Sequence, residues 1–308
     1  MLSLKLLTVL DPTARTLRAG ELRAVFLPGR GMLGASLTQR GNELLGRVQE
    51  LASFAQSGRT CGIPLLYPWA NRLQGTHYDA AGQRVSLDAV SARIGHDGAG
   101  LPMHGVPWPQ LTWQVVDENE RALHARLDWT REELMQIFPF PHHVALRVTL
   151  DENGLNLETT IFADAESRVP ISFGFHPYLI ADAPRAAWRI EMPALKQLEL
   201  DAQQIPNGET TPFPAQSVVL GERDLDDGFA LENAHAEFVV QGGERRFTTT
   251  FLEGFRFAQI FAPRGKDYIA IEPMTAPTNA LVSGRGLRVI APGEMFRATF
   301  RIDTQEVA

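Results

Sequence analysis

The chain has 308 residues, of which 44% are hydrophobic, and it carries a formal net charge of −7 at pH 7. A chain of this length can bury a substantial core, and an acidic balance without a basic block argues against nucleic acid and anionic membranes as partners. The single cysteine, Cys61, excludes an intramolecular disulfide and fits a reducing compartment.

The start of the chain, Met1 to Lys5, lacks the long apolar segment and small-residue cleavage site of a secretory signal. No apolar run in the sequence is long enough to span a bilayer. We therefore expect a soluble, cytoplasmic protein. No repeat, low-complexity segment or linker divides the chain, which predicts a single domain over residues 1–308.

The first sixty residues are predicted to form short strands and turns. Gly29, Gly31 and Gly34 match the G-x-G-x-x-G spacing of dinucleotide sites, but that motif requires a helix directly after it. Residues 35–38 are strand-like instead, and no alternation of strands and helices follows. We therefore expect no nucleotide cofactor here.

Residues 62–73 place an amide and a guanidinium after a proline-rich aromatic run. Asn71 and Arg72 follow Tyr67 and Trp69, and the Arg72 guanidinium can donate a fixed fork of hydrogen bonds to neighbouring hydroxyls. Either aromatic ring can face the apolar side of a sugar. The alternative for Arg72 is a surface ion pair.

A histidine follows a second apolar run at residues 101–106. His104 precedes Gly105, which lets another group come close to the backbone. The alternative is a histidine that faces a loop or the core.

The middle of the chain predicts an antiparallel hairpin. Apolar residues alternate with polar ones from Val144 to Leu150 and from Leu155 to Ile161, and an Asn-Gly turn lies between them. His142 and His143 should point to opposite faces of the first strand, so they cannot hold a metal together. We interpret both as solvated or incidental.

Residues 170–179 deliver a single histidine from an apolar, β-prone run. Pro177 follows His176, which should therefore be extended at a strand end. An imidazole held on a stiff strand between aromatic residues suits proton transfer. The alternative is a core histidine that bonds a backbone carbonyl.

Two acidic positions lie in the last third of the chain. Asp226, Asp227 and Gly228 read as a turn, and their spacing does not fit a calcium-binding loop. Glu272 ends an apolar strand before Pro273, where a carboxylate is costly unless it is paired or functional. It is a candidate base, and the alternative is a partner for a structural arginine. Strands are also predicted at residues 247–251 and 255–261, with a closing strand of alternating burial at residues 296–302.

The order and spacing of several short motifs resemble the aldose 1-epimerase (galactose mutarotase-like) family over nearly the whole chain. The resemblance implies an all-β fold, a large antiparallel β-sandwich of the supersandwich kind, with a sugar bound in a cleft across one face. The matching pieces are residues 68–73 with Gly75 and Tyr78, residues 101–105, 138–141, 174–178, 225–229 and 271–273.

The resemblance also implies roles for six residues in the interconversion of anomers. Glu272 is similar to the family's base and His176 to its acid, and His104 corresponds to a residue that polarises the ring oxygen. Sugar hydroxyls would be held by Arg72, Asn71 and Asp226. The reaction moves only protons, so neither a metal nor a redox cofactor is required.

The family pattern selects between the two adjacent aspartates. Its sugar-binding aspartate directly follows an apolar residue and lies three positions before an aromatic one. Asp226 satisfies this register, between Leu225 and Phe229. Asp227 is then left to shape the turn with Gly228.

The substrate stays open between galactose, glucose and another aldose, because the Phe-His-Pro-Tyr sequence around His176 resembles a broader bacterial branch of the family. A related branch acts on hexose 6-phosphates, and the sequence shows no extra basic cluster for a phosphate dianion. A glycoside hydrolase would use Asp226 and Glu272 as its carboxylate pair but would leave the two histidines without a role. A non-catalytic sugar-binding protein would keep Arg72 and Asp226 alone. The oligomeric state is open.

Overall fold

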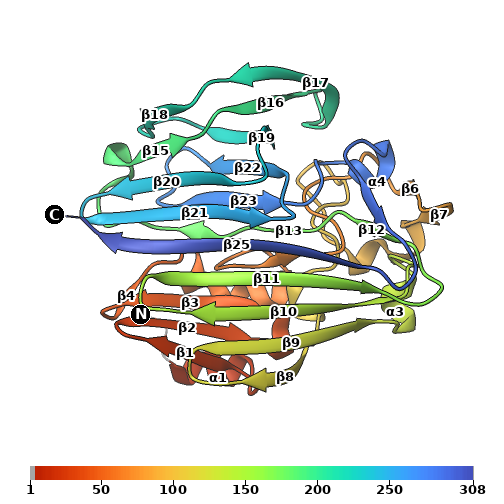
Figure 1. Ribbon diagram of the computed structural model, residues 1–308, viewed down its shortest axis with the longest axis horizontal. Coiled ribbons are helices and arrows are strands. Elements are labelled where there is room, and N and C mark those ends of the chain that lie inside the picture. The colour runs from red at the N-terminus through yellow and green to blue at the C-terminus, as the bar shows by residue number, and fades with distance from the viewer. Residues whose placement is uncertain (1–3, 308) are drawn as a thin grey trace.

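A computed structural model describes residues 4–307, and antiparallel strands dominate it (Figure 1). A nine-stranded and an eight-stranded sheet form the main layers, and three smaller sheets flank them. This arrangement confirms the all-β antiparallel sandwich expected from the sequence. None of the helices in residues 4–307 has the length and apolar character needed to cross a membrane.

The nine-stranded sheet contains the predicted hairpin and the predicted closing strand. In order across the sheet, its strands are β18 (Gln216–Val219), β15 (Arg189–Met192), β20 (Ala236–Gly242), β21 (Arg245–Glu253), β25 (Met295–Glu306), β11 (Gly154–Ala163), β10 (His142–Leu150), β9 (Ala122–Trp129) and β8 (Gln114–Glu118). Leu150 lies opposite Leu155, and residues 151–154 join β10 to β11 as expected. The alternating apolar side chains of β10, β11 and β25 are buried.

The eight-stranded sheet carries most of the polar residues singled out in the sequence. Its path runs β17 (Pro206–Phe213), β16 (Leu195–Leu200), β19 (Leu225–Leu231), β22 (Phe257–Ala262), β23 (Ile269–Met274), β13 (Gly174–Phe175) and β5 (Leu65–Leu66), and β14 (Tyr178–Leu179) pairs with β23 beside that path. Glu272 therefore lies inside β23 rather than at its end, and Pro273 continues the strand opposite Ala258.

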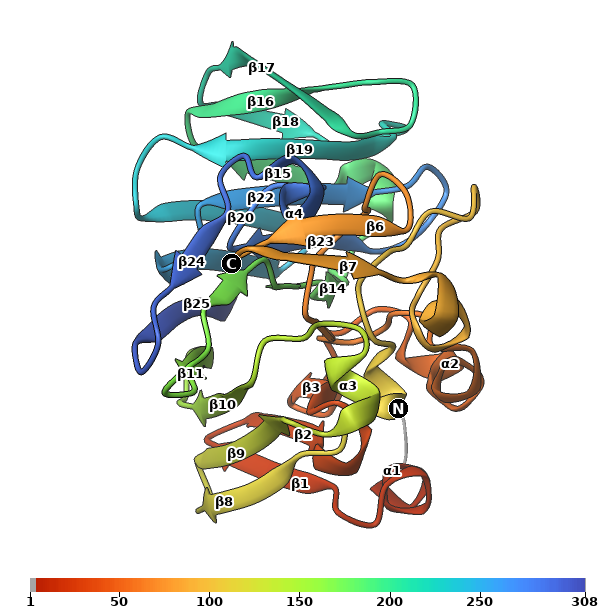
Figure 2. The same ribbon diagram turned by 90° about the vertical axis from the view of Figure 1, so that its right-hand side faces the viewer.

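The smaller elements cover the edges and ends of the two main sheets. Figure 2 shows β6 and β7 turned toward the viewer, with α4 against β6. The small sheets comprise β1 (Arg15–Ala19), β2 (Leu22–Leu27), β3 (Leu33–Gln39) and β4 (Asn42–Glu43); β12 (Val169–Ile171) with β24 (Arg288–Ile290); and β6 (His77–Ala80) with β7 (Gln83–Ser86). The helices are α1 (Leu4–Leu10), α2 (Leu51–Ser57), α3 (Glu132–Met135) and α4 (Ala280–Ser283).

The expectation of only strands and turns in the first sixty residues was wrong, because α1 and α2 lie there. In α2, Leu51 and Phe54 are three positions apart, share one face and are buried in a satellite core. The glycine-rich stretch behaves as expected: a single 3₁₀ turn at Pro28–Arg30 is followed by strand β3, so the helix of a dinucleotide site is absent at this point of the described chain.

Aromatic side chains pack the two main sheets together. Phe300 of β25 contacts Phe175 of β13, with ring centroids 5.0 Å apart, and Phe255 fills the space beside both rings. Phe175 and Phe300 are tilted to each other and Phe255 meets both edge-on, and such packing of large rings adds to the hydrophobic stabilisation of a core. The residue that follows Phe175 is His176, so this core fixes the backbone that carries a candidate functional residue.

His142 is also part of the core, which corrects the interpretation that it is solvated or incidental. Its side chain is fully buried, stacks on Trp129, and hydrogen-bonds the Tyr67 hydroxyl and the Phe140 carbonyl. His143 points to the opposite face of β10 and is half-buried, as the period of a strand requires.

Candidate functional site

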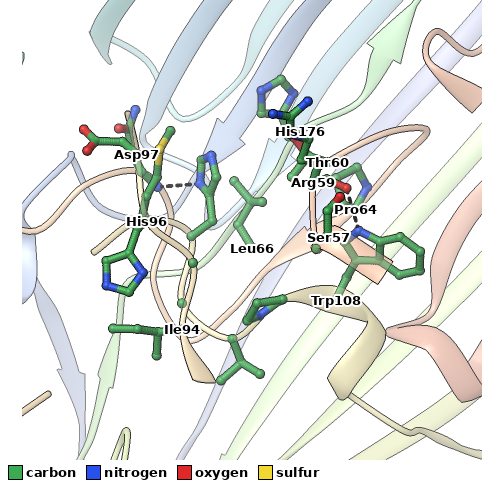
Figure 3. A pocket seen from close by; sticks show the side chains of 18 of the residues that line it. Ser57, Arg59, Thr60, Pro64, Leu66, Ile94, His96, Asp97, Trp108 and His176 are labelled. Carbon is green, nitrogen blue, oxygen red and sulfur yellow. Dashed lines mark hydrogen bonds between the residues drawn. The ribbon is translucent and has the colours of Figure 1, made fainter. Parts of the chain in front are cut away.

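One cavity of about 740 Å³ brings together all six residues that the sequence singled out. Figure 3 shows part of its lining, with His176 labelled. These six residues come from distant parts of the chain, and the lining ranges from Arg47 to Glu272. The six are Asn71, Arg72, His104, His176, Asp226 and Glu272. Its volume lies in the usual range for small-molecule sites.

His176 and Glu272 form a buried contact in the wall of this cavity. His176 Nε2 lies 3.1 Å from Glu272 Oε1, and the two residues are 5% and 2% exposed. The His176 backbone N–H donates to the Pro64 carbonyl, and Gly174 pairs with both Leu66 and Met274. Neighbouring strands therefore hold both side chains, as general acid–base chemistry requires.

Burial shifts the proton affinities of this pair in opposite directions. Loss of hydration raises the pKa of Glu272 well above its usual value, Asp226 raises it further, and Arg72 opposes the shift. Loss of hydration also lowers the pKa of His176, with the neighbouring His104 and Arg47 adding to the effect. Both shifts favour the neutral pair, in which the shared proton lies on Glu272. Its transfer across the 3.1 Å contact to His176 gives the carboxylate and imidazolium that acid–base chemistry requires.

The hydrogen bonds of His104 indicate which of its nitrogens carries the proton. The Asn71 backbone N–H donates to His104 Nδ1 over 3.1 Å. Burial, with a contribution from Arg72, lowers the pKa of His104 to about 3, so the ring is neutral at pH 7. A neutral ring that accepts at Nδ1 carries its hydrogen on Nε2, which makes His104 a donor.

Gly105 allows the close approach expected of it, and the approaching group is the Tyr67 carbonyl. A Cβ at position 105 would lie 2.2 Å from that oxygen, and the φ of Gly105 is +64°. The Val106 N–H donates to the same carbonyl and the His104 N–H to that of Asn71. This backbone pairing fixes His104 beside His176, with ring centroids 6.0 Å apart.

Arg72 is held by a carboxylate and an amide rather than by a surface ion pair. Its Nε donates to Asp97 Oδ2 over 2.8 Å, and the two side chains are 16% and 10% exposed. Asn71 Oδ1 accepts from the backbone N–H and from Nη1 of Arg72. Asn71 therefore orients Arg72 through its oxygen, while both residues line the cavity.

The two adjacent aspartates face different surroundings. Asp226 lines the cavity and accepts a 2.7 Å hydrogen bond from Gln259 Nε2, whereas Asp227 accepts one of 3.0 Å from Gln197 Nε2 and does not line it. The prediction that Asp227 shapes a turn with Gly228 was wrong. Both residues lie inside β19 and pair with Phe261 and Ile260 of β22, so the ladder overrides the local turn preference.

Neither aromatic residue before Asn71 faces the cavity, which corrects a second expectation. Trp69 and Tyr67 are 0% and 2% exposed and belong to the main core. The aromatic part of the lining consists of Tyr178, Phe261 and Trp108.

Four residues that sequence reasoning did not assign complete the site. Gln259 supports Asp226, Asp97 supports Arg72, and Tyr178 places its hydroxyl 3.2 Å from His176 Nε2. Arg47 donates to that hydroxyl over 3.1 Å. Gln259 had a signal, since it is polar within an apolar strand. Asp97 lies in a polar turn, where an aspartate is ordinary, and Arg47 is a single cation in a short turn between apolar residues, so neither was assigned.

Residues 4–307 contain no group of three or more histidine, cysteine, aspartate or glutamate side chains placed to bind a metal ion. The cavity polar groups are arranged instead as one acid–base pair with hydrogen-bonding side chains around it. The chemistry that this arrangement supports is proton transfer to and from a small polar ligand.

Comparison with known proteins finds one family and several related folds. The sequence model described as aldose 1-epimerase matches residues 16–303. The uncharacterized protein YihR of Escherichia coli (strain K12) is 23% identical over 93% of this chain and 92% of its own.

Solved structures with the same fold include a galactose mutarotase-like protein from Clostridium acetobutylicum, with a TM-score of 0.81, 18% identity, and coverage of 96% of this chain and 95% of that one. The Slr1438 protein from Synechocystis sp. PCC 6803 has a TM-score of 0.79 and 24% identity, with 95% and 96% covered. These TM-scores, over nearly the whole of each chain, establish a shared fold.

Proposed function

Because the chain belongs to the aldose 1-epimerase family, we propose that it is an isomerase that interconverts the α and β anomers of a free aldose. The observation that carries this proposal is the buried contact of 3.1 Å between His176 and Glu272 in the cavity wall. A protein that only binds sugar has no need of two buried titratable groups, whose burial costs free energy. An acid–base catalyst needs both.

Ring opening requires one base and one acid. The Glu272 carboxylate takes the proton of the C1 hydroxyl while His176 gives a proton to the ring oxygen, and the bond between C1 and that oxygen breaks. After rotation about C1–C2, the ring oxygen attacks the other face of the aldehyde. Its proton returns to His176, and Glu272 gives its proton to the new C1 hydroxyl, so the proton count is restored.

The remaining cavity residues would hold and polarise the sugar. His104, with its hydrogen on Nε2, donates to the ring oxygen and favours its departure from C1. Arg72, Asn71 and Asp226 hold hydroxyl groups, and Asp97 and Gln259 fix Arg72 and Asp226 in place. The reaction exchanges only protons and requires neither a metal nor a redox cofactor.

We propose that residues 1–308 form one domain, because residues that line the cavity come from most of the length of the chain.

Polarimetry on freshly dissolved α-anomers and on glycosides tests the proposal. The protein should speed equilibration of free aldoses above the spontaneous rate, measured without protein, and should leave glycosides intact. Cleavage of a glycoside would indicate a hydrolase that uses Asp226 and Glu272. A protein that binds sugars without changing either reaction would be a binding protein.

A further inference from the structure

Arg47 lines the cavity without an acidic partner. It is half-buried, and its guanidinium lies over the rings of Phe54, Tyr178 and Tyr268 at 4.6, 5.1 and 5.8 Å from their centroids. Within residues 4–307 its side chain makes one hydrogen bond, from Nη1 to the Tyr178 hydroxyl, and no ion pair within 4.0 Å. A guanidinium has five N–H donors, so most of the Arg47 donors make no bond to the described residues of the protein.

Arg72, another arginine of this cavity, has an acidic partner, unlike Arg47. The charge of Arg72 is balanced by Asp97 at 2.8 Å and its donors are shared with Asn71. A partly buried charge without a counter-ion is unfavourable unless something else supplies the opposite charge. For Arg47 the open side is the cavity, so a ligand can supply it.

Arg47 lies at the His176 side of the acid–base pair. The Tyr178 hydroxyl bridges the two residues, 3.1 Å from Arg47 Nη1 and 3.2 Å from His176 Nε2. Arg59 and Thr60 lie on this side too, and Asp97 lies across the cavity (Figure 3). Arg72 and Asp226 lie at the Glu272 side instead, because both line a second, smaller cavity with Gln259, the cross-strand neighbour of Glu272. The charged groups are thus ordered: Asp226 and Arg72, then Glu272, then His176, then Arg47.

This order fixes the direction of a bound pyranose, an inference that rests on the proposed function. With the C1 hydroxyl at Glu272 and the ring oxygen at His176, C2 and C3 lie toward Asp226 and Arg72. On the other side of the ring oxygen, C5 directs its substituent, C6, toward Arg47.

We propose that the preferred substrate is an aldose with a single negative charge on C6, such as the carboxylate of a hexuronic acid. A carboxylate matches the planar fork of a guanidinium and completes its charge balance. A phosphate dianion would need a second cation close by, and the other arginine on this side, Arg59, is exposed to solvent. The C6 hydroxyl of a neutral hexose would leave the Arg47 charge unbalanced.

Catalysed anomer exchange of paired sugars, measured by NMR saturation transfer, tests this inference. The pairs are glucuronate with glucose and galacturonate with galactose, which differ only at C6, and glucose 6-phosphate is the dianion. We expect kcat/KM for the acid sugar to exceed that of its neutral partner by at least about tenfold, since bonds between charged groups are the stronger class. Rising salt should reduce this ratio.

Variants of Arg47 separate recognition of charge from support of Tyr178. Arg47→Gln should lower the ratio of kcat/KM for the acid sugar to kcat/KM for the neutral sugar by about tenfold. Arg47→Lys keeps the charge but loses the planar pair of donors, so its ratio should lie between those of the wild type and Arg47→Gln. Arg189→Gln removes the same charge from an exposed position on β15 outside the cavity and should leave the ratio unchanged.

Equal activity on acid and neutral sugars, or an equal loss on both in Arg47→Gln, would overturn the inference and leave the isomerase intact. A higher kcat/KM for glucose 6-phosphate than for glucuronate would show that the subsite prefers a phosphate dianion, which contradicts the proposed single charge. If no sugar is turned over, calorimetric titration of glucuronate and glucose still tests the subsite, because tighter binding of glucuronate that is lost in Arg47→Gln supports it and equal binding refutes it.

Discussion

At the scale of single residues, His176 gives the sharpest test of the acid. Asparagine keeps a polar side chain of similar reach but does not transfer a proton near neutrality. His176→Asn should therefore keep the fold and much of the sugar affinity while anomer exchange falls by about 10²-fold or more. Saturation transfer measures the exchange, and circular dichroism verifies the fold. Near-normal exchange in a folded variant would remove His176 from the mechanism.

Glu272 can be tested by substitution and by pH. Glu272→Gln keeps size and hydrogen bonding but is a far poorer proton acceptor, so turnover should collapse while sugar still binds. Because burial and Asp226 raise the pKa of this carboxyl, wild-type kcat/KM should fall, as the pH is lowered, through a pKa above 4.5. Retained turnover in the variant points to another base. A variant that fails to fold indicates a structural role.

Asp226 and Asp227 form a matched pair, since they are adjacent, alike and both half-buried. A carboxylate that accepts sugar hydroxyls contributes about 1.5–3 kcal/mol. Asp226→Asn should raise the Michaelis constant by at least about tenfold, and Asp227→Asn, whose side chain faces Gln197 and does not line the cavity, should change it little. Steady-state mutarotation kinetics of the two variants, compared under conditions of equal stability, measure both Michaelis constants. A larger effect at Asp227 would identify Asp227 as the sugar-binding carboxylate.

At the scale of elements, the segment that carries His104 depends on Gly105. An alanine there would adopt a left-handed φ and place its Cβ 2.2 Å from a backbone oxygen that cannot move independently. Gly105→Ala should lower the free energy of unfolding by at least about 2 kcal/mol and displace His104. Gly98→Ala is the control in the same segment, where a Cβ meets nothing within 4 Å. Urea unfolding of both variants measures the difference, and equal stability would contradict this account.

The strands with strict alternation could be predicted from the sequence, because each buries one face. The hairpin of β10 and β11 and the closing strand β25 are of this kind. Elements whose conformation depends on pairing or packing with distant residues could not be predicted from the sequence. Asp227 and Gly228 favour a turn locally, yet pairing to Ile260 and Gln259 of β22 keeps them extended. The burial of Trp69 likewise depends on packing that the proline-rich segment does not encode by itself.

The candidate site divides in the same way. His104, His176 and Glu272 are polar residues that each follow an apolar run and precede a proline or glycine, so each was visible in the sequence. Arg47 and Asp97 were not, because what distinguishes them is a contact, or the lack of one, across the fold. Local patterns indicate which residues are specialised, whereas their partners depend on tertiary structure.

At the scale of the whole molecule, buried neutral histidines make stability depend on pH. Burial lowers the pKa of His142 to about 4, whereas an unfolded histidine titrates near 6.5. Between these values the unfolded state binds a proton that the folded state does not, so stability falls as the pH drops below about 6.5. The stability advantage of the wild type over His142→Gln should shrink by about 1.6 kcal/mol between pH 6.5 and 5. Chemical denaturation across this range measures it, and a constant advantage would show that His142 titrates normally.

The position of β25 has a consequence for how the protein is made. This strand lies in the interior of the nine-stranded sheet, between β21 and β11, although it is the last strand in the chain (Figure 1). While the ribosome is still synthesising the residues before Met295, β21 and β11 each present an open edge, and open edges invite pairing with other chains. The nascent chain must keep these two edges apart from foreign strands until its own residues 295–306 emerge and join them.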